Sequence, residues 1–161
     1  MEIKGLNMEN VNIIKGRTIG IKKLNPNAVL PTSGSPFAAG YDLYACIDEP
    51  CEIPPHSTVK IGTGLAIEIP VGYVGAIYAR SGIATKRGLR PANCVGLCDS
   101  DYRGEYIVAL HNDSDKTEIV EPNERIAQLV IMPHLLVRWQ EIDELSETER
   151  GDNGFGSTGA K

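Results

Sequence analysis

The sequence predicts a single all-β domain, a sandwich or barrel of antiparallel strands with little helix. Apolar and polar residues alternate with period two along several stretches, as in strands that bury one face. Turn residues, chiefly proline, glycine and asparagine, separate these stretches. The stretches recur roughly every eight to twelve residues, which is the spacing found in sandwiches and barrels.

Along the chain the pattern is strand-like almost throughout. The segment AAGYDLYAC at 38–46 is strand-like, and a hairpin is expected within 91–110, its second strand starting near Gly104. Two short helices are predicted, SGIATKRG at 81–88 and DELSETER at 143–150. Further strands are expected at 57–62, 64–70, 73–80, 104–112, 116–122 and 125–133.

The composition excludes several classes of protein. A chain of 161 residues with 42% hydrophobic residues is the size of one domain with a real core. The formal net charge of −5 argues against nucleic acid as a partner, because such proteins usually carry a basic face. No secretory signal opens the sequence and no apolar run reaches membrane-spanning length, so we expect a cytoplasmic protein with no membrane partner.

The four cysteines, Cys46, Cys51, Cys94 and Cys98, are expected to be reduced thiols. Their spacings, C-x4-C and C-x3-C, differ from the two-residue spacing of common zinc knuckles. The pattern therefore disfavours a zinc site.

Two stretches place polar groups in unusual positions. Asp42 lies among small and apolar neighbours, where a carboxylate is costly unless it is paired, hydrogen-bonded or near a metal; a turn cap is the alternative. Arg80, Ser81 and Gly82 stand where a strand gives way to a helix, and their guanidinium and backbone amides suit a phosphate. Ser81 could equally be an ordinary N-cap.

Two further stretches also carry polar side chains that could be either functional or structural. Asp99 and Asp101 would share one face of an extended segment, with Tyr102 on the other. Paired carboxylates indicate acid–base chemistry or metal binding, whereas an Asp-rich turn is the structural alternative. Gln128 interrupts an apolar strand face; a binding site would supply partners for its amide, and so would water at a sheet edge.

The end of the sequence, RGDNGFGSTGAK, contains a formal G-x-G-x-x-G pattern. That pattern marks a dinucleotide site only where it follows a strand and opens a helix, so no such site is predicted. What remains is a run of backbone amides and hydroxyls that could wrap anionic oxygens.

Five stretches, in this order, resemble the five motifs of the trimeric dUTP pyrophosphatase (dUTPase) family. They are AGYDLYA, ARSGIATKRGL, NCVGLCDSDYRGE, ERIAQLV and RGDNGFGSTG, and they span about residues 38 to 159. One departure is Cys98, where the family more often has an aliphatic residue. Cysteine packs as a small hydrophobe, so the same chemistry is expected.

The resemblance implies a jelly-roll-like β fold and a homotrimer with three active sites at subunit interfaces. It implies hydrolysis of dUTP to dUMP and pyrophosphate with Mg²⁺, which keeps uracil out of DNA and supplies dUMP for thymidylate synthesis. Residues 1–149 would form the β domain. Residues 150–161 would form a flexible arm that closes over a site built by the other two subunits.

The resemblance also assigns roles to residues. Asp99 would activate the attacking water, and Asp42 would hold Mg²⁺ through water. The phosphates would be bound by Arg80, Ser81 and Gly82, and Gln128 would bind the α-phosphate region or a water near it. Uracil and deoxyribose would be held by Asn93, Gly96, Leu97, Cys98, Tyr102 and Ile107. From the arm, Phe155 would cover the uracil face and Arg150, Gly156, Ser157 and Thr158 would reach the substrate.

Two other functions fit the same scaffold. A dCTP deaminase shares the fold but attacks the base, and a non-catalytic nucleotide-binding regulatory protein would hold dUTP without turnover. The DSDY stretch is typical of dUTPases. A decayed site is disfavoured because the full set of expected site residues is present, namely Asp42, Arg80, Ser81, Asp99, Gln128 and Phe155.

Overall fold

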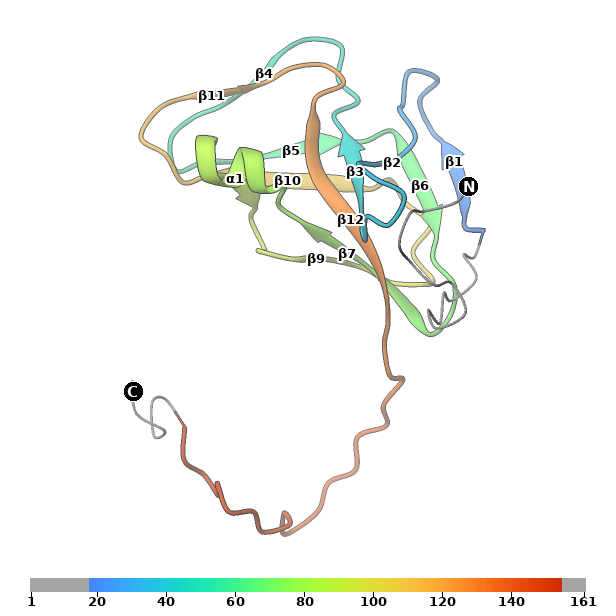
Figure 1. Ribbon diagram of the computed structural model, residues 1–161, viewed down its shortest axis with the longest axis vertical. Helices are drawn as coiled ribbons and strands as arrows, with labels where there is room; N and C mark the ends of the chain where they lie inside the picture. Colours follow the sequence, from blue (N-terminus) through green and yellow to red (C-terminus); the bar gives the residue numbers. More distant parts are fainter. Residues whose placement is uncertain (1–17, 155–161) are drawn as a thin grey trace, which may run out of the picture.

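The computed structural model describes residues 18–154, and this part of the chain is built almost entirely of antiparallel strands (Figure 1). It contains one helix, α1 (Ser81–Arg87). The strands are β1 (Gly20–Lys23), β2 (Thr32–Ser33), β3 (Gly40–Tyr44), β4 (Cys51–Ile53), β5 (Thr58–Gly62), β6 (Leu65–Glu68), β7 (Tyr73–Tyr78), β8 (Leu89–Pro91), β9 (Gly96–Cys98), β10 (Ile107–Asn112), β11 (Glu118–Val120) and β12 (Arg125–Pro133). The all-β prediction is confirmed.

The strands form open sheets that do not close into one barrel within residues 18–154. A five-stranded sheet has the order β2-β3-β12-β7-β9, and a three-stranded sheet has the order β5-β10-β8. Two-stranded sheets, β1-β6 and β11-β4, complete the jelly-roll-like arrangement. Because β12 is the central strand of the largest sheet, its residues are the best placed to bring distant segments together.

The core joins the inner faces of the two larger sheets. Leu43 and Leu129 come from the five-stranded sheet, and Ile61, Val108 and Leu110 come from the three-stranded sheet. All five are nearly inaccessible to water, as the period-two alternation predicts for strands that bury one face.

Helix α1 is held at its C-terminal end by backbone geometry and by ion pairs. It ends at Gly88, whose left-handed φ of 67° lets its amide bond back to Ala84 and Ile83 carbonyl oxygens. Arg87 pairs with Glu118 at 2.6 Å and also with Glu124, which ties the helix to the neighbouring β11 segment. Among the described residues no helix is long and apolar enough to cross a membrane.

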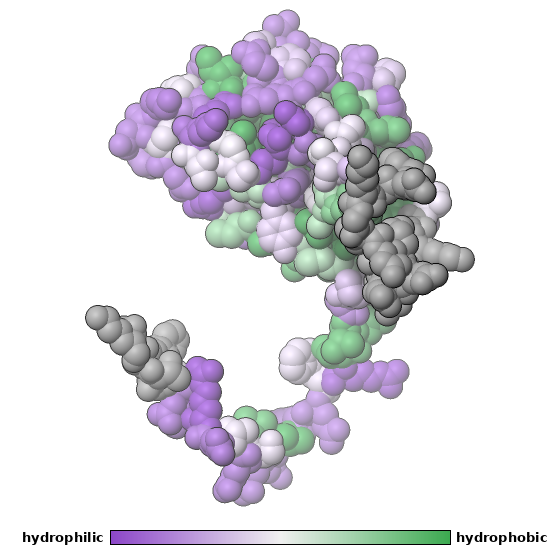
Figure 2. All heavy atoms as spheres, viewed as in Figure 1, coloured by the Kyte–Doolittle hydropathy of each residue, from purple (hydrophilic) through white to green (hydrophobic). Residues whose placement is uncertain are grey.

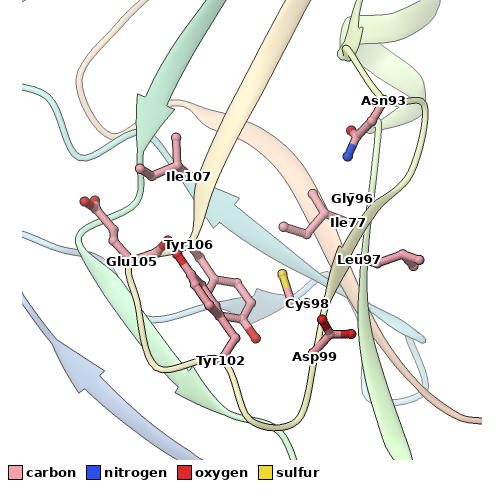
Figure 3. Close-up of a pocket in the computed structure, with 10 residues that line it drawn as sticks. All are labelled: Ile77, Asn93, Gly96, Leu97, Cys98, Asp99, Tyr102, Glu105, Tyr106 and Ile107. Atoms are coloured by element: carbon pink, nitrogen blue, oxygen red, sulfur yellow. Dashed lines mark hydrogen bonds between the residues drawn. The ribbon is translucent and has the colours of Figure 1, made fainter.

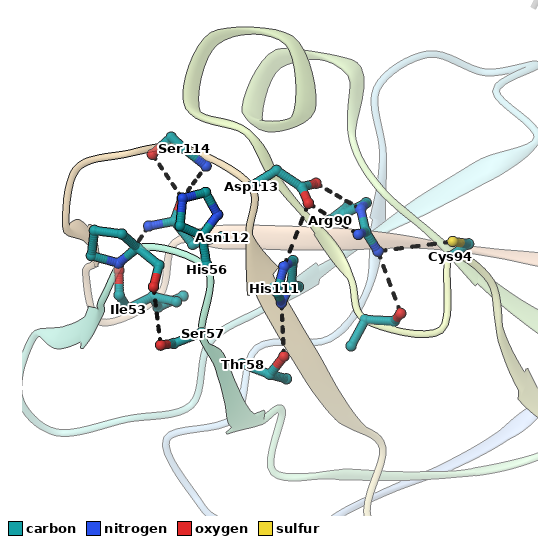
Figure 4. A network of polar contacts seen from close by, with 12 residues as sticks. Ile53, His56, Ser57, Thr58, Arg90, Cys94, His111, Asn112, Asp113 and Ser114 are labelled. Carbon is teal, nitrogen blue, oxygen red and sulfur yellow. Dashed lines mark hydrogen bonds and ion pairs between the residues drawn. The ribbon is translucent and has the colours of Figure 1, made fainter.

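The β8–β9 turn is fixed by Arg90 (Figure 4). Its guanidinium forks onto Asp113, with distances of 2.7 and 3.0 Å, and also donates to the carbonyl oxygen of Ala92 at 3.3 Å. These hydrogen bonds hold the pKa of the Asp113 carboxyl below its ordinary value. The turn that carries Asn93 is thereby anchored to the end of β10.

The predicted helix at 143–150 is wrong. Residues 134–154 contain neither helix nor strand and lead away from the β domain (Figure 1). Leu145, the apolar residue of this stretch, is 85% exposed. A helix this short needs an apolar face packed against something else, and nothing within residues 18–154 covers Leu145.

The predicted hairpin within 91–110 is also wrong. Strand β9 pairs with β7, whereas β10 pairs with β5 and β8, so the connection crosses between sheets. The second strand begins at Ile107 rather than near Gly104. Asp99 and Asp101 lie in a turn closed by the Tyr102 amide on the Asp99 carbonyl oxygen, at 3.2 Å, so strand alternation does not apply to them.

Candidate active site

A cluster of polar side chains lies where β3, β12 and β7 run side by side. Gln128 of β12 is paired in register with Asp42 of β3 and with Tyr78 of β7. Arg80, two residues after Tyr78, donates from Nε to Asp42 Oδ1 at 2.6 Å. We call Asp42, Arg80, Arg125 and Gln128 the polar cluster.

The structure decides between the alternatives that the sequence left open for this cluster. Asp42 sits inside β3 and pairs with arginines, so it is not a turn cap. Gln128 lies on a central strand and donates to the Ala79 carbonyl oxygen at 2.9 Å, so it does not face water at an edge. Arg80, rather than Ser81, is the N-cap residue of α1, and no side chain caps the helix.

Arg125 is a member of the cluster that sequence analysis missed. It donates from Nη1 to Asp42 Oδ2 at 3.2 Å. Arg125 and Gln128 are three positions apart, so strict alternation would place them on opposite faces of β12. The register of β12 against β3 shifts between Arg125 and Ala127, and this bulge turns the guanidinium toward Asp42.

A separate cavity of about 250 Å³ lies beside β9 and the loop that follows it (Figure 3). Every residue expected to hold uracil and deoxyribose lines it, and so does Asp99. Three lining residues were not expected. The full lining is Ile77, Asn93, Gly96, Leu97, Cys98, Asp99, Tyr102, Glu105, Tyr106 and Ile107.

The floor of this cavity is apolar and tightly packed. A Cβ on Gly96 would lie 3.3 Å from Ile77 Cβ, so strand β9 approaches β7 closely at this residue. Cys98 is buried, and burial raises the pKa of its thiol, which therefore stays neutral and packs as a small hydrophobe. Burial likewise raises the pKa of the Tyr106 hydroxyl beneath the loop.

The polar cluster and Asp99 lie at opposite ends of β7. Cys98 pairs with Gly75, so Asp99 lies level with Val74 near the start of β7, whereas Arg80 follows the end of that strand. Six residue steps at about 3.3 Å each separate them by roughly 20 Å along the strand. Groups that act on one phosphorus atom must lie within hydrogen-bond reach of its oxygens. A single chain therefore does not bring both to one phosphorus.

The other residues predicted to bind the substrate lie next to Arg80 or in the C-terminal arm. Ser81 and Gly82 open α1 and are exposed, next to Arg80. Arg150 is exposed and donates to the Asn153 carbonyl oxygen at 3.0 Å. The other arm residues, Phe155, Gly156, Ser157 and Thr158, lie outside the described residues.

Within residues 18–154, no three His, Cys, Asp or Glu side chains gather into a group that could hold a metal ion. Both carboxylate oxygens of Asp42 already accept hydrogen bonds from guanidinium groups. This arrangement fits an ion that keeps its own water ligands better than a metal held directly by protein side chains.

A guanidinium–carboxylate cluster suits phosphate oxygens, and a pocket lined by strand and loop residues suits a small molecule, so this jelly-roll-like domain has the features of a nucleotide-binding enzyme. The model of the family described as dUTPase matches residues 26–159. The chain belongs to the dUTPase family.

Known proteins similar to this chain agree with that assignment. Deoxyuridine 5'-triphosphate nucleotidohydrolase of Hydrogenobaculum sp. is 50% identical over 141 residues, covering 88% of this chain and 97% of the relative. The protein of that name from Desulfitobacterium hafniense is 47% identical over 150 residues, covering 92% and 99%. The solved structure of the Staphylococcus bacteriophage 80alpha dUTPase with dUpNHpp has a TM-score of 0.82 at 31% identity, covering 90% of this chain and 100% of that one.

Proposed function

We propose that this chain hydrolyses dUTP to dUMP and pyrophosphate by water attack at the α-phosphorus. Family membership supports the reaction. The observation that carries it is that Asp99 and the residues expected to hold uracil and deoxyribose line one cavity. The enzyme would work in the cytoplasm, where its free cysteines would remain reduced, and would keep uracil out of DNA while supplying dUMP for thymidylate synthesis.

In the proposed mechanism Asp99 accepts a proton from a water placed in line with the α-phosphorus. Removing that proton as the oxygen attacks contributes about 10²–10⁴-fold to the rate. Negative charge grows on the leaving pyrophosphate, and a guanidinium fixed nearby stabilises it. Asp99 is exposed, so its carboxylate can reach a water beside the α-phosphorus without a rearrangement of the fold.

Arg80 would bind the phosphates, with Ser81, Gly82 and Gln128 beside it. Its Nε is held by Asp42, which leaves the two terminal amino groups to fork onto phosphate oxygens. The contact also limits the orientations of the side chain, so less entropy is lost when substrate binds. Arg125 would add a second positive charge at the same place.

Mg²⁺ would be held by triphosphate oxygens and water, with Asp42 contacting it through water. This proposal rests on the two hydrogen bonds that Asp42 already accepts and on the preference of Mg²⁺ for its own water ligands. When bound, the ion would neutralise part of the phosphate charge.

Base and sugar selection would come from the cavity. The backbone of β9 would pair with one edge of uracil, and cytosine would leave buried groups unpaired there. Tyr102 would lie under the deoxyribose and crowd a 2′-hydroxyl. The arm, with Arg150, Phe155, Gly156, Ser157 and Thr158, would close over the nucleotide and exclude bulk water.

We further propose a homotrimer whose sites are shared between copies. The roughly 20 Å along β7 between the polar cluster and Asp99 supports this, because two copies could bring them together where one cannot. Segment 134–154 supports it as well, since Figure 2 shows apolar atoms along it and a neighbouring copy would cover them. The exposed apolar residues there are Leu135, Leu136, Val137, Trp139, Ile142 and Leu145.

The function is tested by measuring pyrophosphate release from each deoxy- and ribonucleoside triphosphate. We expect dUTP to be preferred over dCTP, dTTP and UTP by at least about 10²-fold in kcat/KM. Ammonia release from dCTP would indicate the deaminase instead. Tight dUTP binding without pyrophosphate release would indicate the regulatory binding protein.

The shared site is tested by mixing two inactive variants, Arg80→Ala and Asp99→Asn. Random assembly from equal amounts, after joint refolding or co-expression, should restore about a quarter of the wild-type rate, because about one site in four receives an intact residue from each chain. The matched control mixes Arg80→Ala with Gln128→Ala, which lie in one cluster, and should restore nothing. A first mixture that stays inactive would contradict shared sites.

A further inference from the structure

Tyr102, the residue placed under the deoxyribose, is held by three consecutive residues of its own loop (Figure 3). A Cβ on Gly104 would lie 2.4 Å from the Tyr102 hydroxyl oxygen, so the ring can occupy its position only above a glycine. The hydroxyl donates to the Glu105 carbonyl oxygen at 2.9 Å. The Tyr106 ring lies 6.1 Å away, centroid to centroid, tilted by 43°.

The side chain of Glu105 joins this loop to the turn between β5 and β6. Its Oε1 accepts a hydrogen bond from the Gly64 amide at 2.8 Å. The carboxylate rests directly on Gly62, where a Cβ would come within 2.5 Å of Oε1. Hydrogen bonds to an ionised acceptor are about twice as strong as neutral ones, so this contact is a firm anchor.

The backbone beyond Glu105 is fixed to the same turn independently. The Tyr106 amide donates to the Leu65 carbonyl oxygen at 2.8 Å, and the Thr63 amide and hydroxyl donate to the Tyr106 carbonyl oxygen at 3.1 and 2.7 Å. Tyr106 would therefore stay in place without the carboxylate. The carboxylate therefore fixes Glu105 itself, whose backbone carbonyl oxygen accepts the hydrogen bond from the Tyr102 hydroxyl.

We propose that Glu105 is a positioning residue for sugar selection: its carboxylate, anchored on the Gly64 amide, fixes the carbonyl oxygen that holds Tyr102 under the deoxyribose. This inference rests on the proposed function. Glu105 lines the cavity, and in this inference it acts through Tyr102 and not through its own contact with the substrate. Its effect passes through the Tyr102 ring, so it acts on the choice between deoxyribose and ribose more than on the attacking water.

The first test compares Glu105→Ala and Glu105→Gln. In the alanine variant the ratio of kcat/KM for dUTP to kcat/KM for UTP should fall about tenfold, because one charge-assisted hydrogen bond is lost. The fall should come mainly from a higher KM for dUTP. Glutamine keeps an oxygen that can accept the Gly64 amide, so most of the preference should return. The matched control is Glu52→Ala. Glu52 is an exposed glutamate of β4, distant in sequence from Glu105, and its replacement should leave the preference at the wild-type value.

The second test displaces the carboxylate while leaving Glu105 intact. In Gly62→Ala the new methyl group would push Oε1, the end of a flexible side chain, off the Gly64 amide at little cost in stability. The sugar preference should fall as in Glu105→Ala. Gly34→Ala, where a Cβ would have nothing within 4 Å, is the control and should change nothing.

An unchanged dUTP over UTP preference in both Glu105→Ala and Gly62→Ala would overturn the proposal. So would a lower melting temperature with an unaltered preference, since that result describes a purely structural side chain. The NMR signals of the Tyr102 ring, assigned with Tyr102→Phe, give a readout that needs no turnover: they should shift in both variants. A wild-type chain that does not hydrolyse dUTP would reject the proposed function, whereas unshifted Tyr102 signals would reject this inference alone.

Discussion

Replacing Asp99 by asparagine is expected to lower kcat for dUTP hydrolysis by about 10²–10⁴-fold while dUTP affinity changes by no more than a few fold. Asparagine has nearly the same shape but cannot accept a proton from the attacking water. The turn that carries Asp99 is closed by its backbone carbonyl oxygen, not by its side chain, so the loop should keep its conformation. Pyrophosphate release and calorimetric binding of a non-hydrolysable dUTP analogue would measure the two quantities.

Asp101→Asn is the matched control for that experiment. Asp101 is a second exposed carboxylate of the same turn, and it does not line the cavity. Its replacement should leave kcat within about twofold, since surface substitutions away from a site have small effects. Equal losses in the two variants, or a wild-type rate in Asp99→Asn, would contradict the role of Asp99 as the general base.

Deleting residues 150–161 is expected to reduce kcat/KM for dUTP by about 10²-fold or more without unfolding the protein. The loss follows from the proposed arm, whose arginine, hydroxyls and aromatic ring would otherwise contact the nucleotide and exclude water. Stability should be kept, because the buried core residues in the described part of the chain end at Leu129. Steady-state kinetics, thermal unfolding and light scattering would measure the three consequences.

A shorter deletion is the control for the arm. Removing Ala160 and Lys161 leaves every residue assigned to the substrate in place and should leave kcat/KM near the wild-type value. Dissociation of the oligomer in the longer deletion, with an equal loss in the shorter one, would show that the end of the chain acts in assembly instead of over the site.

Much of the fold was predictable because alternation is a local property. Strands β3, β5, β6, β7, β10, β11 and β12 all fall within the strand-like segments expected from the sequence. The helix after Arg80 was predicted as well. Strands β1, β2, β4 and β8 were not predicted, and each has only two to four residues.

Some residues of the candidate site were likewise predictable from the sequence, and others were not. Side chains with a distinctive setting, such as Asp42 among apolar neighbours, were found from the sequence, and so were the residues around Asp99. Arg125 and Glu105 were missed. Arg125 reaches Asp42 only through a bulge in β12, and Glu105 meets Gly64 only because β10 pairs with β5, a strand far away in the sequence.

The sequence by itself determined the strand pattern, the turn chemistry and the identity of the reactive side chains, since each depends on residues close together in the chain. Only the tertiary structure decided which of those side chains meet. It paired Asp42 with two arginines, anchored the Tyr102 loop on a distant turn, and set Asp99 and Arg80 at opposite ends of β7. Strand neighbours and register are chosen by burial of the whole core, which is a property of segments far apart in the sequence.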